Sequence, residues 1–241
     1  MNSIKKIIVA NWKMNPLTLI EAEDLYRNSG EAIICPPFVY LETLSRIGSS
    51  MLGAQDCHWE DEGAFTGEVS PKMLKNLGVK YVIIGHSERR MLGETDEVVN
   101  KKLKAALRNE LMPIVCLGER VRDENFKEFL KDQVEKTFAG LSTDEIGKCL
   151  IAYEPVWTIS TTLGARPDTP ENALESISII KNILNSKFQI LNSVFLYGGS
   201  VTSKNVRDFI SRPEIAGALI GGASVDQEEF KKIMEIVFSF Q

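Results

Sequence analysis

Eight short apolar runs recur along the chain about every 30 residues, and this repeat limits the possible folds more than any other feature of the sequence. Helical patterns lie between the runs. Most of the runs are continuously apolar rather than alternating, as expected of parallel strands that are buried on both faces. We expect strands at Lys6–Asn11, Glu31–Cys35, Met51–Ala54, Tyr81–Gly85, Met112–Leu117, Cys149–Tyr153, Val194–Tyr197 and Ala218–Gly221.

Two of the intervening helices have recognisable N-termini. Residues 94–109 place apolar side chains on one helical face, and Thr95 precedes two acidic residues that suit the positive end of a helix dipole. Thr169 is a favourable N-cap residue, and Pro170 suits the first helical position. The sequence therefore predicts strands that alternate with helices.

Eight strand–helix units in 241 residues predict an α/β fold, a (β/α)8 barrel with a parallel eight-stranded core. We expect residues 1–241 to form a single catalytic domain of this kind. The alternative is a doubly wound open sheet, for which six strands normally suffice, but no Gly-x-Gly-x-x-Gly motif follows the first strand.

Composition argues against several classes of partner. The formal net charge is −5 with both signs well mixed, so we expect no nucleic-acid partner. No stretch approaches the roughly 20 apolar residues of a membrane span, so we expect no membrane partner. The four cysteines form no Cys-x-x-Cys pair, which favours buried, reduced thiols in a cytoplasmic protein.

Two titratable residues follow apolar strands at the end where barrels of this kind carry their chemistry. His86 follows Tyr81–Gly85 and precedes a short helical run, whose N-terminus disfavours the imidazolium form. Glu154 follows the strand at Cys149–Tyr153, where a buried carboxylate is costly unless it is used or paired. A neutral imidazole and a carboxylate facing one small substrate suit proton transfer next to a carbonyl group.

Other residues at the same strand ends suggest an anionic substrate. Lys13 follows the first strand together with Asn11, and its ammonium group can neutralise a phosphate or a developing oxyanion. Glycine-rich turns follow the seventh and eighth strands, with Ser200 in the first and Gly221 and Gly222 in the second. Backbone amides in such turns bind phosphate.

We interpret one further segment as a lid and two further titratable residues as structural. The polar segment 158–169 begins shortly after Glu154 and is long for a compact barrel, which suits a lid over the site. His58 lacks a setting like that of His86, so we interpret it as structural. We also interpret Glu119 as structural, as an acceptor for the indole N–H of Trp157.

Taken with these residues, the motifs of the chain resemble those of the triosephosphate isomerase family. The matching segments occur in family order and cover nearly the whole length, at residues 10–15, 35–38, 53–56, 63–68, 84–90, 113–116, 152–157, 197–200 and 221–224. The resemblance implies a TIM barrel that interconverts dihydroxyacetone phosphate and D-glyceraldehyde 3-phosphate, an aldose–ketose isomerisation of glycolysis and gluconeogenesis.

The resemblance also implies roles for individual residues, without cofactor or metal. Glu154 would be the base, neutral His86 would polarise the carbonyl group, and Lys13 with Asn11 would stabilise the negative oxygens. The amides of Ser160, Ser200 and Gly222, with Gly221 adjacent, would hold the phosphate, and Ile159 and Leu219 would cover the base. The segment 63–68 would insert into the neighbouring subunit of a homodimer.

The chain departs from the family pattern in the predicted lid. The segment is about three residues longer than usual, and Ser160 and Thr162 replace the two customary glycines, which restricts positive φ angles. We expect a working lid with altered opening kinetics. The alternative is a catalytically altered or silent relative that binds a small phosphorylated ligand.

Overall fold

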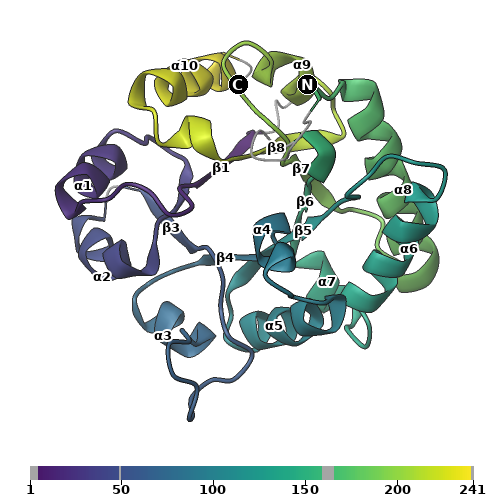
Figure 1. Cartoon of the computed structure of the whole chain (residues 1–241), viewed down its shortest axis with the longest axis horizontal. Coiled ribbons are helices and arrows are strands. Elements are labelled where there is room, and N and C mark those ends of the chain that lie inside the picture. Colours follow the sequence, from purple (N-terminus) through teal and green to yellow (C-terminus); the bar gives the residue numbers. More distant parts are fainter. Residues whose placement is uncertain (1–4, 49, 159–165, 240–241) are drawn as a thin grey trace.

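The computed structural model describes residues 5–48, 50–158 and 166–239. Its strands form one closed, parallel barrel in the order β1 to β8, and β8 pairs with β1 (Figure 1). The closed barrel confirms the predicted fold class and excludes the open sheet. The strands are β1 (Ile7–Asn11), β2 (Ile33–Cys35), β3 (Met51–Ala54), β4 (Tyr81–Ile84), β5 (Met112–Leu117), β6 (Leu150–Tyr153), β7 (Val194–Tyr197) and β8 (Ile215–Ile220).

The eighth strand begins three residues before the predicted start at Ala218. Gly217 lies within it and pairs with Ile7 of β1 and Leu196 of β7. A Cβ atom on Gly217 would lie 1.8 Å from the carbonyl oxygen of Ile7, so the close approach of the two strands requires a glycine there. A glycine that weakens a strand signal in the sequence is thus needed to close the barrel.

Helices surround the barrel (Figure 1). The predicted N-cap Thr169 accepts the N–H of Asn172, and Thr95, before the acidic first turn of its helix, is also an N-cap and accepts the N–H of Val98. The α-helices are α1 (Leu19–Arg27), α2 (Phe38–Ile47), α3 (Pro71–Asn76), α4 (Ser87–Met91), α5 (Asp96–Arg108), α6 (Phe126–Thr137), α7 (Thr143–Gly147), α8 (Pro170–Phe188), α9 (Val206–Ile210) and α10 (Gln227–Phe238), and the 3-10 helices are η1 (Val156–Thr158) and η2 (Gly222–Ser224).

The core has two layers because each strand is apolar on both faces. The outer layer lies between the strands and the helices and contains large side chains such as Trp12, Tyr26 and Phe138. The inner layer fills the barrel itself, with Val9, Ile33, Cys35, Ile83, Ile114, Cys116, Leu150, Ala152, Leu196 and Leu219. Side chains therefore fill the barrel interior, and any site must lie at one of its ends.

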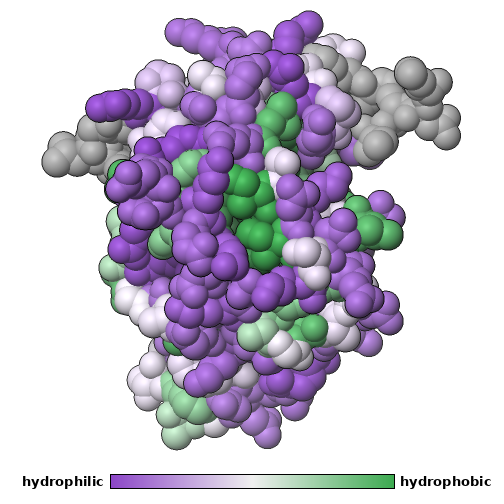
Figure 2. Space-filling view, turned by 90° about the vertical axis from the view of Figure 1, so that its right-hand side faces the viewer, coloured by the Kyte–Doolittle hydropathy of each residue, from purple (hydrophilic) through white to green (hydrophobic). Residues whose placement is uncertain are grey.

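The outer surface over α6 and α8 is mostly hydrophilic, around one apolar hollow (Figure 2). This distribution follows from the helix pattern, since α8 buries Ala173, Ile177, Ile180 and Leu184 on its inner face. Among the described helices, none is both long enough and apolar enough to cross a membrane.

All four cysteines are buried and free, as the sequence predicts. Burial raises the pKa of the Cys149 thiol to about 12 and raises those of Cys35, Cys57 and Cys116 further. The thiols therefore stay protonated and unreactive at neutral pH.

Candidate active site

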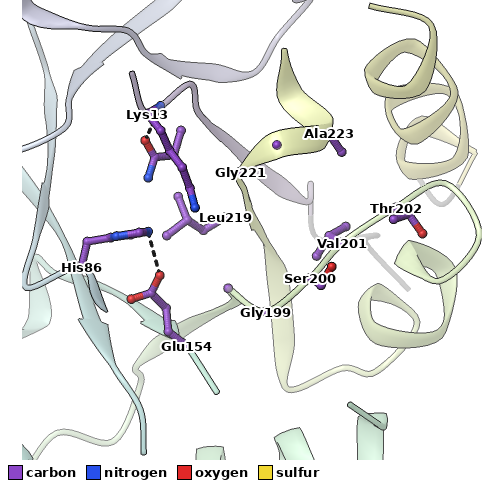
Figure 3. Close-up of a pocket in the computed structure, with 13 residues that line it drawn as sticks. Lys13, His86, Glu154, Gly199, Ser200, Val201, Thr202, Leu219, Gly221 and Ala223 are labelled. Carbon is purple, nitrogen blue, oxygen red and sulfur yellow. Dashed lines mark hydrogen bonds and ion pairs between the residues drawn. The ribbon is translucent and has the colours of Figure 1, made fainter. Parts of the chain in front are cut away.

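A pocket of about 300 Å³ opens at the carboxyl ends of the strands. Its titratable side chains lie on one side and its glycine-rich turns on the other (Figure 3). The pocket brings together seven of the eight predicted site residues, while the eighth, Ser160, lies outside the described residues. The lining consists of Asn11, Lys13, His86, Glu154, Gly198, Gly199, Ser200, Val201, Thr202, Leu219, Gly221, Gly222 and Ala223.

The barrel explains why residues far apart in the sequence meet here. Asn11 is the last residue of β1, His86 follows β4 by two positions, and Glu154 comes directly after β6. The strands are parallel, so their carboxyl ends converge on one mouth. Lys13 has a φ of 55°, a left-handed conformation that is uncommon for a residue with a side chain.

His86 and Glu154 are in direct contact on one side of the pocket. Nε2 of His86 lies 3.0 Å from Oε1 of Glu154, and both side chains are more than nine-tenths buried. The other carboxylate oxygen, Oε2, accepts the backbone N–H of Ser87 at 3.0 Å. The carboxylate is thus held by two donors and lies against the pocket.

The hydrogen bonds of His86 fit the neutral ring with its proton on Nε2. His86 occupies the N-cap position of α4, and its Nδ1 accepts the backbone N–H of Glu88 at 3.2 Å. A proton on Nδ1 would face that N–H group and lose the bond. The Nε2–H group therefore points to Oε1 of Glu154, on the pocket side of the ring.

Opposing influences act on the pKa of His86. Burial lowers the pKa, as does Lys13, but the Glu154 carboxylate at 3.0 Å outweighs them and raises it above its ordinary value. The imidazole is consequently more basic while it faces Glu154 than it would be alone. Separation of the two groups would favour the neutral form that the sequence predicts.

Glu154 shows the complementary balance. Burial raises its pKa, but His86, the N–H of Ser87 and Lys13 together outweigh burial and hold the pKa below its ordinary value. The carboxylate is therefore ionised at neutral pH. Loss of its two hydrogen bonds would leave burial dominant and make it a stronger base.

The glycine-rich turns leave no room for side chains at two positions. A Cβ atom on Gly198 would lie 2.9 Å from Cγ of Glu154, and one on Gly199 would lie 2.2 Å from the hydroxyl oxygen of Tyr197. The backbone of this turn consequently approaches both the carboxylate and the pocket. Backbone that lines a pocket at the end of a strand suits the binding of an anion.

Comparison with known proteins agrees with this geometry. The family model described as triosephosphate isomerase matches residues 6–237, which is nearly the whole chain. The chain belongs to the triosephosphate isomerase family.

Relatives called triosephosphate isomerase support the assignment along the full length. Those of Dictyoglomus turgidum, Alkaliphilus oremlandii and Moorella thermoacetica are 41%, 40% and 42% identical to the chain. Each alignment covers 95% of this chain and 98% of the relative. The family is one of isomerase enzymes, and the pocket lies where its barrel carries chemistry.

Within this triosephosphate isomerase fold, Glu88 is a pocket neighbour that the sequence did not identify. Its Oε1 lies 2.7 Å from Nζ of Lys13, and both side chains are partly exposed. Glu88 lies in the first turn of α4, between Ser87 and Arg89. Acidic residues are common there because they interact favourably with the positive end of the helix dipole. The pairing with Lys13 spans 75 positions, so only the fold reveals it.

Val201, Thr202 and Ala223 also line the pocket without having been predicted. They directly follow the predicted residues of the two glycine-rich turns, so those turns were the feature of the sequence that could have indicated them. Among the described residues, no group of three histidine, cysteine or acidic side chains is placed to hold a metal ion.

The two structural interpretations agree with the described contacts. Oε1 of Glu119 accepts the indole N–H of Trp157 at 3.2 Å and the hydroxyl of Tyr153 at 2.8 Å. His58 is buried away from the pocket, with its ring 4.5 Å from that of Phe65. Neither residue reaches the pocket lining.

Proposed function

We propose that this chain, acting as a single domain, interconverts dihydroxyacetone phosphate and D-glyceraldehyde 3-phosphate with no cofactor or metal. The observation that carries the proposal is the buried His86–Glu154 contact, which faces a pocket of about 300 Å³ with glycine-rich turns on its other side. A volume of this size suits a three-carbon phosphate. The names of the relatives point to the same substrate class.

Glu154 is the proposed base. Its carboxylate would take a proton from the carbon next to the carbonyl group and return it to the neighbouring carbon, which exchanges ketose and aldose. A substrate that separates the carboxylate from His86 and Ser87 removes the contacts that lower its pKa. The pKa of the base would then rise at the moment when it must accept a proton.

His86, Lys13 and Asn11 would stabilise the enediolate formed by this transfer. The Nε2–H of His86 would donate to the carbonyl oxygen and relay protons between the two oxygens. Lys13 carries a positive charge at the same end of the barrel. Its Nζ lies 2.7 Å from Oε1 of Glu88, so the ammonium group would contact Glu88 and the substrate together. Asn11 adds a polar side chain beside Lys13, whose N–H already contacts Asn11 Oδ1 at 3.1 Å.

The phosphate would bind on the glycine-rich side of the pocket, at the backbone N–H groups of Ser200 and Gly222 with Gly221 adjacent. Leu219 lines the pocket between the two sides, where it can exclude water from the base. The roles predicted for Ile159, Ser160 and most of the lid segment 158–169 fall outside the described residues and stay predictions.

A coupled assay with glyceraldehyde 3-phosphate tests the proposal when run beside Glu154→Gln. The amide keeps the size of the side chain but cannot accept the proton, so rapid turnover should be lost in the variant while the fold is kept. A folded wild type without turnover would contradict the proposal. That outcome would favour the silent, ligand-binding relative, which binding of inorganic phosphate would then identify.

We further propose a cytoplasmic homodimer that uses segment 63–68. The segment contacts His58, whose Nδ1 lies 3.4 Å from Oε2 of Glu68 and whose ring lies tilted against that of Phe65. Phe65 nonetheless stays 42% exposed, as a side chain that contacts a second subunit would be in one chain alone. Size-exclusion chromatography with light scattering at micromolar concentration should give twice the chain mass, and a clean monomer would contradict the proposal.

A further inference from the structure

The two glycine-rich turns of the pocket follow different strands, yet one side chain joins the segments to which they belong. Glu229 lies in the first turn of α10, the helix that comes after the turn at the end of β8. Its Oε1 accepts the backbone N–H of Ser203 at 2.6 Å, and its Oε2 accepts the hydroxyl of Ser203 at 3.0 Å. Ser203 lies three positions after Ser200, in the segment that follows β7. The carboxylate therefore ties the segment after β7 to the segment after β8.

The local structure of α10 does not require this contact. Glu229 is the third residue of the helix, the position from which a glutamate in a capping box reaches back to the N-cap residue. Its backbone N–H donates to Oδ1 of the N-cap residue Asp226 at 3.0 Å, but both of its carboxylate oxygens accept from Ser203. Hydrogen bonds to an ionised carboxylate are roughly twice as strong as neutral ones, so the side chain holds the other segment firmly.

The segment after β7 is also braced from within. Oδ1 of Asn205 accepts the backbone N–H of Thr202 at 2.8 Å, and Nδ2 of Asn205 donates to the carbonyl oxygen of Ser200 at 2.9 Å. In the described part of the chain, no group accepts a hydrogen bond from the backbone N–H of Ser200 or of Gly222. Both residues line the pocket, and the two turns lie on the same side of it (Figure 3). One N–H group from each turn is thus available to a single anion.

We propose that Glu229 is a positioning residue for the substrate phosphate, because its contact with Ser203 sets the separation between the two turns. The inference rests on the proposed function, since it needs one phosphate that is bound by both turns. Glu229 is partly exposed and lies outside the pocket lining. A separation that is fixed before the ligand arrives lowers the free-energy cost of ordering the turns on binding.

The test compares Glu229→Ala with Glu229→Gln. Alanine removes both acceptors, whereas glutamine keeps an acceptor for the N–H of Ser203 and offers an amide N–H to its hydroxyl, which can accept as well as donate. Glutamine should therefore keep the tie that alanine loses. Glu228→Ala is the matched control, because Glu228 lies in the same helical turn, is exposed and has no hydrogen bond or ion pair within the described residues.

Three readouts separate positioning of the phosphate from general damage to the fold. The first is the dissociation constant of inorganic phosphate by calorimetry, and the second is kcat/KM for glyceraldehyde 3-phosphate. The third is the rate at which glyceraldehyde, which lacks the phosphate, exchanges its carbon-bound proton in D2O, followed by NMR. A residue that acts through the phosphate should alter the first two and leave the third unchanged.

Glu229→Ala should weaken the binding of phosphate by about tenfold, the size expected for the loss of a hydrogen bond to a charged group. The value of kcat/KM for the phosphorylated substrate should fall by at least a similar factor, while exchange of glyceraldehyde stays within about twofold. Glu229→Gln should stay within about threefold of the wild type, and Glu228→Ala should match it. Ser203→Ala loses only the hydroxyl contact, so it should fold even if Glu229→Ala does not, and it should weaken phosphate binding by about threefold.

Unchanged phosphate affinity in Glu229→Ala and Ser203→Ala, in a wild type that binds phosphate and turns over the triose, would overturn this inference alone. Equal losses in the alanine and glutamine variants at position 229 would also overturn it, as would an equal loss in the exchange of glyceraldehyde. A folded wild type that neither binds phosphate nor turns over the triose would overturn the proposed function together with this inference.

Discussion

Helix α4 contributes adjacent residues to two clusters of ion pairs that are built differently. Glu88 belongs to the pocket, where it contacts Nζ of Lys13 at 2.7 Å. Arg89 belongs to the second cluster, where its Nε lies 3.0 Å from Asp56 and 2.8 Å from Glu94. One short helix therefore borders both clusters.

The cations of the two clusters differ in how fully they are enclosed. The side chain of Lys13 is 22% exposed, and that of Lys102 in the second cluster is 3% exposed. Nζ of Lys102 contacts both oxygens of Asp56, at 2.8 and 2.7 Å, and also Oε1 of Glu94. Lys102 is thus surrounded by carboxylate oxygens that belong to the protein.

The difference separates an ion cluster that can exchange partners from one that cannot. In the pocket, Lys13 and His86 are held by side chains at the edge of a cavity, so a ligand can take the place of one partner. In the second cluster Lys102, Asp56 and Glu94 contact one another and are almost fully buried, so loss of Lys102 leaves two buried carboxylates with only the more exposed Arg89 to compensate them. Changes in the pocket should therefore alter turnover, and changes around Lys102 should alter stability.

The largest expected effect comes from Lys102→Met. Removal of the ammonium leaves Asp56 and Glu94 near one another, with burial and Glu94 both raising the pKa of Asp56. The free energy of unfolding should fall by about 3–5 kcal/mol, as for other broken buried ion pairs. Chemical denaturation measures the loss, and turnover per folded molecule should be unchanged. A stable variant with impaired turnover would break the comparison.

The next largest effect is expected from Glu154→Asp, which draws the base back by one methylene group. Misplacement of a catalytic group by about 1 Å costs about 100-fold in rate, so kcat should fall by about that factor. Affinity for inorganic phosphate and the melting temperature should stay close to those of the wild type. Steady-state kinetics beside thermal denaturation measure both, and a lowered melting temperature with unchanged kcat would reverse the assignment of the two clusters.

A smaller effect sharpens the account of the pocket. In Glu154→Gln the main influence that raises the pKa of His86 is gone and only the smaller one of Glu88 is left, while burial and Lys13, which both lower the pKa, remain. The pKa of His86 should therefore fall relative to the wild type, and the ring should stay neutral to lower pH. An NMR titration of the two histidines measures this shift, with His58 as an internal reference, and an unchanged His86 pKa would show that the contact is electrostatically weak.

The smallest effect is expected at an exposed pair. Glu42 and Arg46 lie one helical turn apart on α2, and both side chains are more than half exposed. Glu42→Ala should change the free energy of unfolding by less than about 0.5 kcal/mol, because solvent screens such pairs. Denaturation at low and high salt checks it. A loss as large as that in Lys102→Met would mean that enclosure does not govern the strength of these pairs.

Much of the pocket could be predicted because it depends on the repeat rather than on side-chain contacts. Lys13, His86 and Glu154 follow three apolar strands, and a barrel brings the ends of its strands to one mouth. The glycine-rich turns with Ser200 and Gly222 were found in the same way. These predictions needed the position of each residue along its strand and little else.

Contacts between distant side chains could not be predicted. Lys102 lies in the run Lys101-Lys102-Leu103-Lys104, which is typical of a solvated helix face, and its burial depends on Asp56, which lies 46 positions away. The pairing of Asp168 with Tyr197 likewise joins the end of one loop to the end of a strand. Such contacts arise only when the elements pack, so local pattern carries no signal for them.

The pairing of β1 with β8 has a consequence for synthesis of the protein. The two strands are separated by most of the chain, yet Asn11 and Lys13 after β1 and Gly221 and Gly222 after β8 line the same pocket. While the ribosome is still making the last quarter of the chain, the mouth of the barrel lacks one wall. Emergence of enzymatic activity during translation would consequently report the moment of ring closure, because a nascent chain that ends before β8 lacks Gly221 and Gly222 of the pocket.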